Sequence, residues 1–418
     1  MANNFRELGI SEELELVLRK EGITKPTPVQ EKSIPDLLNG KDVIAQAQTG
    51  TGKTLAFMLP LIQKIDESKG DIQGLIITPT RELAIQITNE AKKLSGAKDI
   101  TILAAYGGQD VEQQVRKLKN GIHLVIATPG RLLDHMRRGT INLGKLQTLV
   151  LDEADEMLRM GFLNDIESIV LGTPKTRQTM LFSATIPNDV RSLGTKFMKS
   201  PVQIEVQGDN ITLDEIKQVV LETTDRGKLD TLCQLIDEFR PYLAIVFCRT
   251  KRRVSSLHAD LRARGYNADE LHGDLSQGKR ERVMKSFRNA EIQILVATDI
   301  AARGLDVEGI THVINYDIPE DAESYIHRIG RTGRIGNLGM AVTIITERDK
   351  SALALIERKI KMDFNPKAIE REKSKGKKRE DVRAPKKNLK AKRQGDERGK
   401  SPGYKKRPTG KKNNRKRR

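Results

Sequence analysis

The chain has 418 residues, 37% of them hydrophobic and 31% charged, which is the balance of a globular protein. Domains typically span about 100–200 residues, so we expect two folded domains with additional segments. No apolar run approaches the roughly 20 residues that a membrane-spanning helix needs, and the start MANNFRELGI lacks the pattern of a secretion signal. With two cysteines and no metal-ligand spacing among the six histidines, we expect neither a disulfide scaffold nor a zinc enzyme.

The basic residues are concentrated at the C-terminus. The net charge of the whole chain is +18, and residues 367–418, with 24 basic and 6 acidic residues, account for all of it. This segment has almost nothing to bury, so we expect a disordered tail. Its Lys and Arg residues favour attraction to the phosphates of a nucleic acid, although a solubility tail or a targeting address would have a similar composition.

Residues 1–366 alternate short apolar runs with amphipathic stretches, a pattern typical of strands and crossover helices in a parallel α/β sheet. In the first half, the predicted strands are Val43–Ala47, Leu75–Thr78, Leu124–Ala127, Leu146–Leu151 and Thr179–Phe182. A polar segment at residues 207–214 is predicted to be a linker. In the second half, the predicted strands are Ala244–Cys248, Ile292–Ala297, His312–Asn315 and Ala341–Ile345. The amphipathic segment Ser351–Phe364 is expected to pack on the second domain.

A phosphate-binding loop is predicted directly after the first strand. The segment AQTGTGKT consists of Ala47, Gln48, Thr49, Gly50, Thr51, Gly52, Lys53 and Thr54. Its glycines allow backbone N–H groups to approach phosphate at the N-terminus of a helix, Lys53 would reach the β- and γ-phosphates, and Thr54 would bind Mg²⁺. Ala47 stands where the general pattern has glycine. Without its context, the segment could be an ordinary tight turn.

An acidic pair follows a later predicted strand, in the segment LQTLVLDEAD. Asp152 would hold Mg²⁺, as the corresponding carboxylate does in P-loop enzymes, and Glu153 could orient and deprotonate the attacking water. The alternative is that these acidic residues simply begin a helix.

The second half has no phosphate-binding loop of its own but contains HRIGRTGR, residues 327–334. Arg331 and Arg334 could stabilise negative charge on the γ-phosphate in the transition state. A solvated basic loop would look similar. If the arginines do act on ATP bound by the first domain, hydrolysis requires the two domains to close.

These motifs, in this order, resemble the DEAD-box ATP-dependent RNA helicases over nearly all of residues 1–350, including the literal Asp152-Glu153-Ala154-Asp155. The segment GITKPTPVQ, residues 22–30, is similar to the family's Q motif, so the resemblance assigns Lys25 and Gln30 to the nucleotide. Phe5 lies where the family carries an aromatic that packs on the base. Ile23 departs from the aromatic residue usual at its position.

The resemblance extends to further motifs, whose loops could otherwise be ordinary turns. It implies contacts with the RNA backbone for Arg81, Gly108, Thr128, Arg131, Arg249, Gln277, Arg280 and Thr298. It implies that Gly304 and Asp306 approach the nucleotide. It implies that Asp155, Ser183, Thr185 and His327 couple ATP hydrolysis to RNA binding.

The implied architecture is α/β, with two tandem RecA-like domains and a disordered basic tail. The expected segments are a Q-motif region at 1–32, the first domain at 33–206, the linker at 207–214, the second domain at 215–366 and the tail at 367–418. The implied function is RNA-stimulated hydrolysis of ATP, with Mg²⁺, coupled to domain closure and the local unwinding of short duplexes. With aromatics at 4% and no Trp, recognition through the RNA backbone is more plausible than base stacking.

Two alternatives remain open from the sequence: a DNA-directed helicase, and an ATP-gated RNA clamp that unwinds little. The preference for RNA over DNA comes from the resemblance alone. Ribosome assembly and RNA turnover are both compatible, with ribosomal or RNA-decay proteins as partners. The lack of an organelle signal favours the cytoplasm, and no membrane association is expected.

Overall fold

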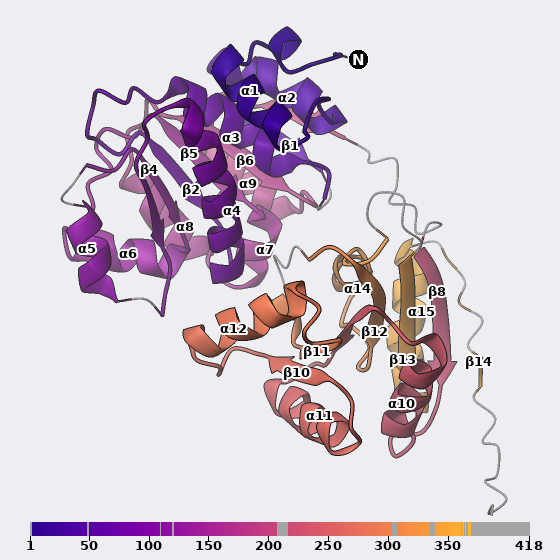
Figure 1. The fold of residues 1–418 in the computed structure, drawn as a ribbon. Helices are drawn as coiled ribbons and strands as arrows, with labels where there is room; N and C mark the ends of the chain where they lie inside the picture. The colour runs from indigo at the N-terminus through magenta and orange to yellow at the C-terminus, as the bar shows by residue number, and fades with distance from the viewer. Residues whose placement is uncertain are drawn as a thin grey trace, which may run out of the picture. The chain divides into compact units, whose positions relative to one another are not determined.

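The computed structural model describes residues 2–47, 50–108, 110–118, 121–206, 216–302, 307–333, 339–360, 362, 364 and 367–368. Two seven-stranded sheets organise them, and every strand pair in both sheets is parallel. We call the elements up to the end of the first sheet the first lobe and the remainder the second lobe (Figure 1). This is the α/β architecture expected from the sequence.

The first sheet has the strand order β3-β4-β2-β5-β6-β1-β7. Its strands are β1 (Val43–Gln46), β2 (Gly74–Ile77), β3 (Ile102–Ala105), β4 (Leu124–Ala127), β5 (Thr148–Asp152), β6 (Gln178–Ser183) and β7 (Val202–Glu205). Its helices are η1 (Arg6–Leu8), α1 (Glu12–Lys20), α2 (Pro28–Leu38), α3 (Lys53–Lys64), α4 (Arg81–Leu94), η2 (Ser95–Ala97), α5 (Val111–Leu118), α6 (Pro129–Arg137), α7 (Ala154–Arg159), α8 (Leu163–Leu171) and α9 (Asn188–Phe197).

Both faces of this sheet are covered, which explains why its strands are apolar runs rather than alternating ones. Ile76 and Val150 point into a core shared with α1 to α4, whereas their neighbours Leu75 and Leu149 point into a second core shared with α6 to α9. The two cores fix the sheet between the helical layers and leave the carboxyl ends of the strands for loops.

The second sheet has the strand order β10-β11-β9-β12-β13-β8-β14. Its strands are β8 (Ile216–Glu222), β9 (Leu243–Phe247), β10 (Ala268–Leu271), β11 (Ile294–Ala297), β12 (Ile310–Asn315), β13 (Gly339–Ile345) and β14 (Lys367–Ala368). Its helices are α10 (Lys228–Phe239), α11 (Lys251–Ala263), α12 (Gln277–Arg288), α13 (Asp299–Ala302), α14 (Ala322–Ile329), η3 (Glu347–Asp349) and α15 (Lys350–Ile360). Val246 faces the core of α10 and α11, while Ile245 and Phe247 face that of α12 and α13.

Polar residues just after strands begin the helices that carry the motifs. Thr80, Thr250 and Ser276 each accept a hydrogen bond through the side chain from the backbone N–H three residues on, at 3.3, 3.2 and 3.4 Å. Such caps satisfy N–H groups that have no partner within the helix. The motif residues therefore start helices α4, α11 and α12 at a fixed place.

All nine strands predicted from apolar runs are present, with ends shifted by a few residues. Five strands were missed: β3, β7, β8, β10 and β14.

The prediction that Ser351–Phe364 packs on the second half is confirmed, because Leu353, Ile356 and Phe364 share a core with α14. The predicted linker at residues 207–214 and the tail beyond residue 368 lie outside the described residues. Within the described chain, no helix has the length and apolar character to cross a membrane.

Candidate functional site

The predicted phosphate-binding loop joins β1 to α3. Gly50 and Gly52 have φ values of +85° and +89°, a left-handed conformation that favours glycine. Lys53 is the first residue of α3, and its side chain is buried. Its Nζ has no hydrogen-bond partner among the described residues. A buried ammonium group is costly without a partner, so the loop is suited to an anionic ligand. Gln48 and Thr49 lie outside the described residues.

Gln30 connects the predicted Q motif to this loop. Its Nε2 donates to the carbonyl oxygen of Gly52 at 3.0 Å, and its Oε1 accepts from the backbone N–H of Thr27 at 2.9 Å. A Cβ atom on Gly52 would lie 2.5 Å from Gln30 Nε2, so only glycine fits this approach. Phe5 is fully buried in the first-lobe core and Lys25 is exposed. Their contacts with a nucleotide stay predictions.

The acidic pair lies at the carboxyl end of β5, which is separated from β1 by the single strand β6. Burial raises the pKa of Asp152 to about 7, although the positive charge of Lys53 opposes the rise. A divalent cation would stabilise the charged form of such a carboxylate. Glu153 has φ 52° and ψ 50°, a left-handed conformation uncommon for a residue with a Cβ atom. This backbone turn separates Asp152 on the strand from the start of α7, so strand and helix both contribute to the motif.

Asp155 ties α7 to the end of β6. Its Oδ2 accepts from the backbone N–H of Thr185 at 2.8 Å and from the Thr185 hydroxyl at 2.9 Å, and its Oδ1 accepts from Glu156 N–H at 3.0 Å. The Ser183 hydroxyl accepts from Asp155 N–H at 3.1 Å. Although burial would raise it, the pKa of Asp155 is lowered by Ser183, Lys53 and Thr185. Three residues predicted to act in coupling are thus joined by hydrogen bonds.

Residues of the second lobe line the same pocket as the first-lobe motifs. The pocket is lined by Lys53, Glu153, Asp155, Glu156, Ala184, His327 and Arg331. Arg331 is buried, and its Nε donates to the His327 carbonyl oxygen at 3.2 Å. Arg328, from the same motif, instead bonds Asp299 through two contacts of 2.5 and 2.7 Å. Arg334, Gly304 and Asp306 lie outside the described residues, so their roles stay predictions.

Sequence reasoning missed Glu323 and Arg159, which connect the two lobes. Glu323 Oε1 lies 2.6 Å from the Thr185 hydroxyl and 2.8 Å from Arg159 Nη2. Arg159 Nη1 also donates to the Ser324 hydroxyl at 3.1 Å. Ligand atoms of Asp155, Glu323 and His327 lie within 4.8 Å of one another, but Glu323 is already engaged by Arg159. Neither Glu323 nor Arg159 belongs to a motif with a spacing signal, so nothing in the sequence selects them.

A second pocket, of about 490 Å³, contains many of the predicted RNA contacts. It is lined by Pro79, Thr80, Arg81, Glu82, Gly107, Thr128, Gly130, Arg131, Asp134, Met160, Phe162, Gly273, Arg280 and Ile300. Gly108 borders it, since a Cβ atom there would lie 2.7 Å from Arg81 Nη1. Arg81 Nη1 also donates to Gln277 Oε1 at 3.4 Å. The structure therefore gathers most of the predicted set around Arg81.

Arg280 has a carboxylate partner that was not predicted. Its Nε and Nη2 lie 2.8 and 2.7 Å from Glu82 Oε1, and both side chains are about nine-tenths buried. Arg249 and Thr298 do not line the pocket. Arg249 instead bonds Asp317 through its backbone N–H and the Ile318 carbonyl through its guanidinium, at 3.0 and 3.3 Å.

The first lobe is a parallel-sheet domain with the predicted phosphate-binding loop. The second lobe is a parallel-sheet domain without such a loop, and it contributes Arg331 to the same pocket. This arrangement defines the class of two-lobed P-loop ATPases. Two family models match the chain: the DEAD/DEAH box helicase at residues 27–193 and the helicase conserved C-terminal domain at residues 227–336. The chain is 52% identical over 361 residues to the DEAD-box ATP-dependent RNA helicase CshA of Bacillus cereus, covering 86% of this chain and 69% of that protein.

The Bacillus subtilis protein of the same description is 50% identical over 365 residues, covering 87% of this chain and 74% of that protein. Among solved structures, S. cerevisiae Dbp5 bound to RNA and ADP BeF3 is similar, with a TM-score of 0.81, 31% identity, and coverage of 88% of this chain and 96% of that one. Mss116p bound to ssRNA and AMP-PNP is similar with a TM-score of 0.79, 31% identity, and coverage of 87% and 78%.

The chain belongs to the DEAD-box ATP-dependent RNA helicases, enzymes that hydrolyse ATP. The family, the enzyme class and the RecA-like fold expected from the sequence are confirmed.

Proposed function

We propose that this enzyme hydrolyses ATP when RNA binds, and that hydrolysis is coupled to closure of the two lobes and local unwinding of short duplexes. The observation that carries the proposal is the pocket shared by Lys53 and Glu153 of the first lobe and Arg331 of the second. A catalytic arginine supplied by a separate lobe acts only when that lobe is in place. Hydrolysis can therefore depend on whatever brings the lobes together.

On the first lobe, Lys53 binds the β- and γ-phosphates of ATP, and Thr54 and Asp152 hold Mg²⁺. The unpartnered ammonium of Lys53 and the buried carboxylate of Asp152, whose pKa is raised by burial, support this assignment. When bound, Mg²⁺ neutralises charge on the phosphates. Gln30 holds the Gly52 carbonyl, so it positions the loop in addition to contacting the nucleotide.

Glu153 orients the attacking water and accepts its proton, and Arg331 with Arg334 stabilises the charge that develops on the γ-phosphate. Asp155 links this chemistry to Thr185 and thereby to Glu323 of the second lobe. Because the Thr185 hydroxyl carries one proton, it donates to only one of the two carboxylates at a time. A change in lobe position would switch that donor between them.

RNA binds along the pocket around Arg81, where backbone phosphates meet Arg131 and Arg280. The bound states of Dbp5 and Mss116p, which share this fold, support RNA as the ligand. The basic residues 367–418 provide a further attachment to RNA. We retain the domain boundaries expected from the sequence, except that β14 (Lys367–Ala368) extends the second domain into the expected tail. We also retain a cytoplasmic location, and a role on large structured RNA in ribosome assembly or RNA turnover, with ribosomal or RNA-decay proteins as partners.

The decisive experiment is steady-state ATP hydrolysis by the full chain alone, with single-stranded RNA, and with DNA of the same sequence. Stimulation by RNA alone is expected. Equal stimulation by DNA would favour a general nucleic-acid translocase, and stimulation by neither would overturn the coupling. A strand-displacement assay on a short RNA duplex then separates a helicase from an ATP-gated clamp, which would hydrolyse ATP without releasing the strand.

The variant Glu153→Gln tests the assignment of the water-activating residue. It should bind ATP and RNA but turn over at least about a hundredfold more slowly, as expected for loss of a general base. Glu167→Gln is the matched control, because Glu167 lies on α8 and pairs with the exposed Lys196. Near-normal turnover by Glu153→Gln would show that another group activates the water.

A further inference from the structure

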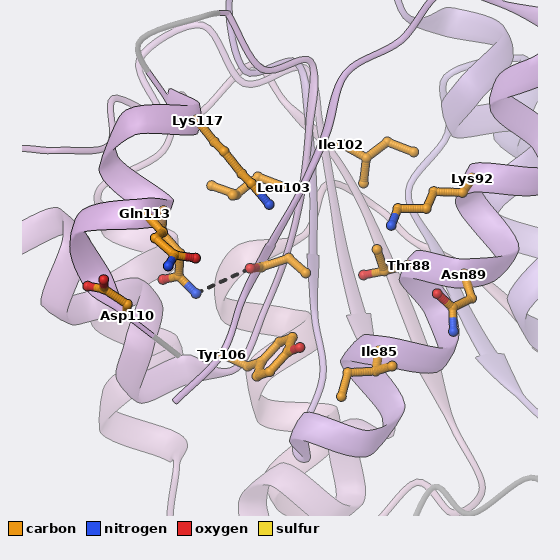
Figure 2. Close-up of a pocket in the computed structure, with 12 residues that line it drawn as sticks. Ile85, Thr88, Asn89, Lys92, Ile102, Leu103, Tyr106, Asp110, Gln113 and Lys117 are labelled. Carbon is orange, nitrogen blue, oxygen red and sulfur yellow. Dashed lines mark hydrogen bonds between the residues drawn. The ribbon is translucent and has the colours of Figure 1, made fainter. Parts of the chain in front are cut away.

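Helix α5 buries a glutamine in the position where a surface helix usually buries an apolar residue. Gln114 is the fully buried residue of α5 and is 2% exposed, while Val111, Val115 and Leu118 are only half-buried. A cavity of about 380 Å³ separates much of α5 from α4. Figure 2 shows Asp110, Gln113 and Lys117 on one side of this cavity, facing the α4 side chains across β3.

The buried amide makes hydrogen bonds that link α5 to two other elements. Its Nε2 donates to the Ala104 carbonyl oxygen of β3 at 3.4 Å, which is the dashed line in Figure 2. Its Oε1 accepts from Arg131 Nη1 at 3.2 Å and lies 2.8 Å from His135 Nε2. Because an amide oxygen can only accept, His135 carries its proton on Nε2. Burying an amide is tolerable only when it is bonded in this way.

Gln114 therefore fixes the guanidinium of Arg131, which lines the pocket proposed to bind RNA. The amide is uncharged, so it holds Arg131 without cancelling its positive charge. The carboxylate nearest in sequence, Asp134, lines the same pocket; it accepts from Arg138 Nε at 2.8 Å and also acts electrostatically on Arg131. Arg280 provides the contrast in the same pocket, since its guanidinium is bonded to the carboxylate of Glu82.

We propose that Gln114 is a positioning residue for RNA binding: its amide oxygen holds the guanidinium of Arg131 at the RNA pocket in the orientation that meets a backbone phosphate. This inference rests on the proposed function, because it requires that Arg131 contacts RNA. Gln114 itself does not line the pocket and touches RNA only through Arg131.

The test is the affinity of the full chain for a labelled single-stranded RNA in the presence of AMP-PNP, measured by fluorescence anisotropy over a range of salt. Gln114→Glu keeps the acceptor and the size of the side chain but adds a negative charge beside Arg131. Gln114→Leu removes the acceptor. Gln73→Leu is the matched control, because Gln73 is equally buried in the first lobe but bonds Asp66 and Lys69.

Gln114→Glu should weaken RNA binding about tenfold, because its carboxylate competes with the RNA phosphate for Arg131. The size of the effect is that of losing one hydrogen bond between Arg131 and a charged phosphate. It should also lower the slope of log affinity against log salt by about 0.7, the value for one phosphate contact on a single strand. Gln114→Leu should weaken binding less and should have no further effect when Arg131 is already alanine. Nucleotide affinity without RNA should stay unchanged in all of these variants, and Gln73→Leu should bind RNA normally.

Two outcomes would overturn the inference, and they are distinguishable. If Arg131→Ala weakens RNA binding but Gln114→Glu leaves affinity and salt slope unchanged, the positioning role of Gln114 is wrong while the RNA pocket stands. If Arg131→Ala itself binds RNA normally, the proposed RNA contact at Arg131 fails, and the inference fails with it. A thermal melt of each variant identifies any loss that comes from unfolding.

Discussion

The variant Asp155→Asn should destabilise the first lobe, because it replaces one of two acceptor oxygens by an NH₂ group. The two oxygens of Asp155 serve different backbone donors: Oδ1 accepts from Glu156 N–H and Oδ2 from Thr185 N–H. Whichever way the new amide turns, one of these N–H groups faces another donor. The substitution therefore cannot preserve both bonds, although its volume is unchanged.

Each hydrogen bond to a charged group contributes about 1.5–3 kcal/mol, and the second bond is weakened by loss of the charge. We expect a loss of about 2–4 kcal/mol in the free energy of unfolding, or roughly 5–10 °C in the melting temperature of a lobe of this size. Asp71→Asn is the matched control, since Asp71 is exposed and its substitution should change stability by less than about 0.5 kcal/mol.

The assay is thermal unfolding followed by circular dichroism, without nucleotide, at several pH values. The pKa of Asp155 is lowered below its usual 3.8, so its contribution to stability is present above that pH and is lost as the pH falls through the lowered pKa. Asp155→Asn lacks a titrating group there, so its deficit against the native chain should shrink in acid. A deficit under about 1 kcal/mol at neutral pH, or one that grows in acid, would show that the charged Asp155 carboxylate does not stabilise the lobe through these two backbone bonds.

The nucleotide loop and the charge distribution lead to two further predictions. Gly52→Ala should weaken ATP binding strongly without unfolding the lobe, because the new Cβ would lie 2.5 Å from Gln30 Nε2 and because a φ of +89° disfavours alanine. Equilibrium binding of a fluorescent ATP analogue measures the affinity, and a near-normal affinity would contradict the prediction. Removing residues 370–418, which leaves β14 paired with β8, should lower RNA affinity and reduce the salt slope by about 0.7 for each phosphate that the tail neutralises. An unchanged slope would show that the tail does not meet RNA.

The strands that could be predicted are those buried on both faces, because burial on both sides requires a continuous apolar run. The missed strands lie at or next to the sheet edges. Strand β10 contains Asp269 and Glu270, and β7 has an exposed Gln203 and Glu205. Neither pattern is distinguishable from a polar loop without its partner strand.

The motif residues could be selected from the sequence because phosphate chemistry restricts which residue types work at fixed spacings. Their partners could not be selected, because long-range partners have no spacing rule. Glu82 and Arg280 are nearly two hundred positions apart, as are Arg81 and Gln277. Only the fold shows that one arginine of the pocket proposed to bind RNA is bonded to an amide and another to a carboxylate.

Arg280 is bonded to a carboxylate, whereas Arg131 is bonded to an amide. Removing the charge of the partner of Arg280 should therefore strengthen RNA binding, whereas adding a charge at Gln114 should weaken it. The carboxylate of Glu82 compensates the charge of Arg280, so Arg280 should contribute less to phosphate binding than its position suggests. Glu82→Gln retains an acceptor oxygen for the guanidinium but removes the compensating charge. RNA affinity should therefore rise several-fold, and the salt slope should increase by about 0.7.

The same anisotropy titration measures this change, with Glu90→Gln as the control, since Glu90 lies on the same helix and pairs with the half-exposed Lys93. A fall in RNA affinity with an unchanged salt slope would mean that Glu82 orients Arg280 rather than competing with phosphate for it. In that case the charge of the partner would not decide which arginines of the pocket bind RNA.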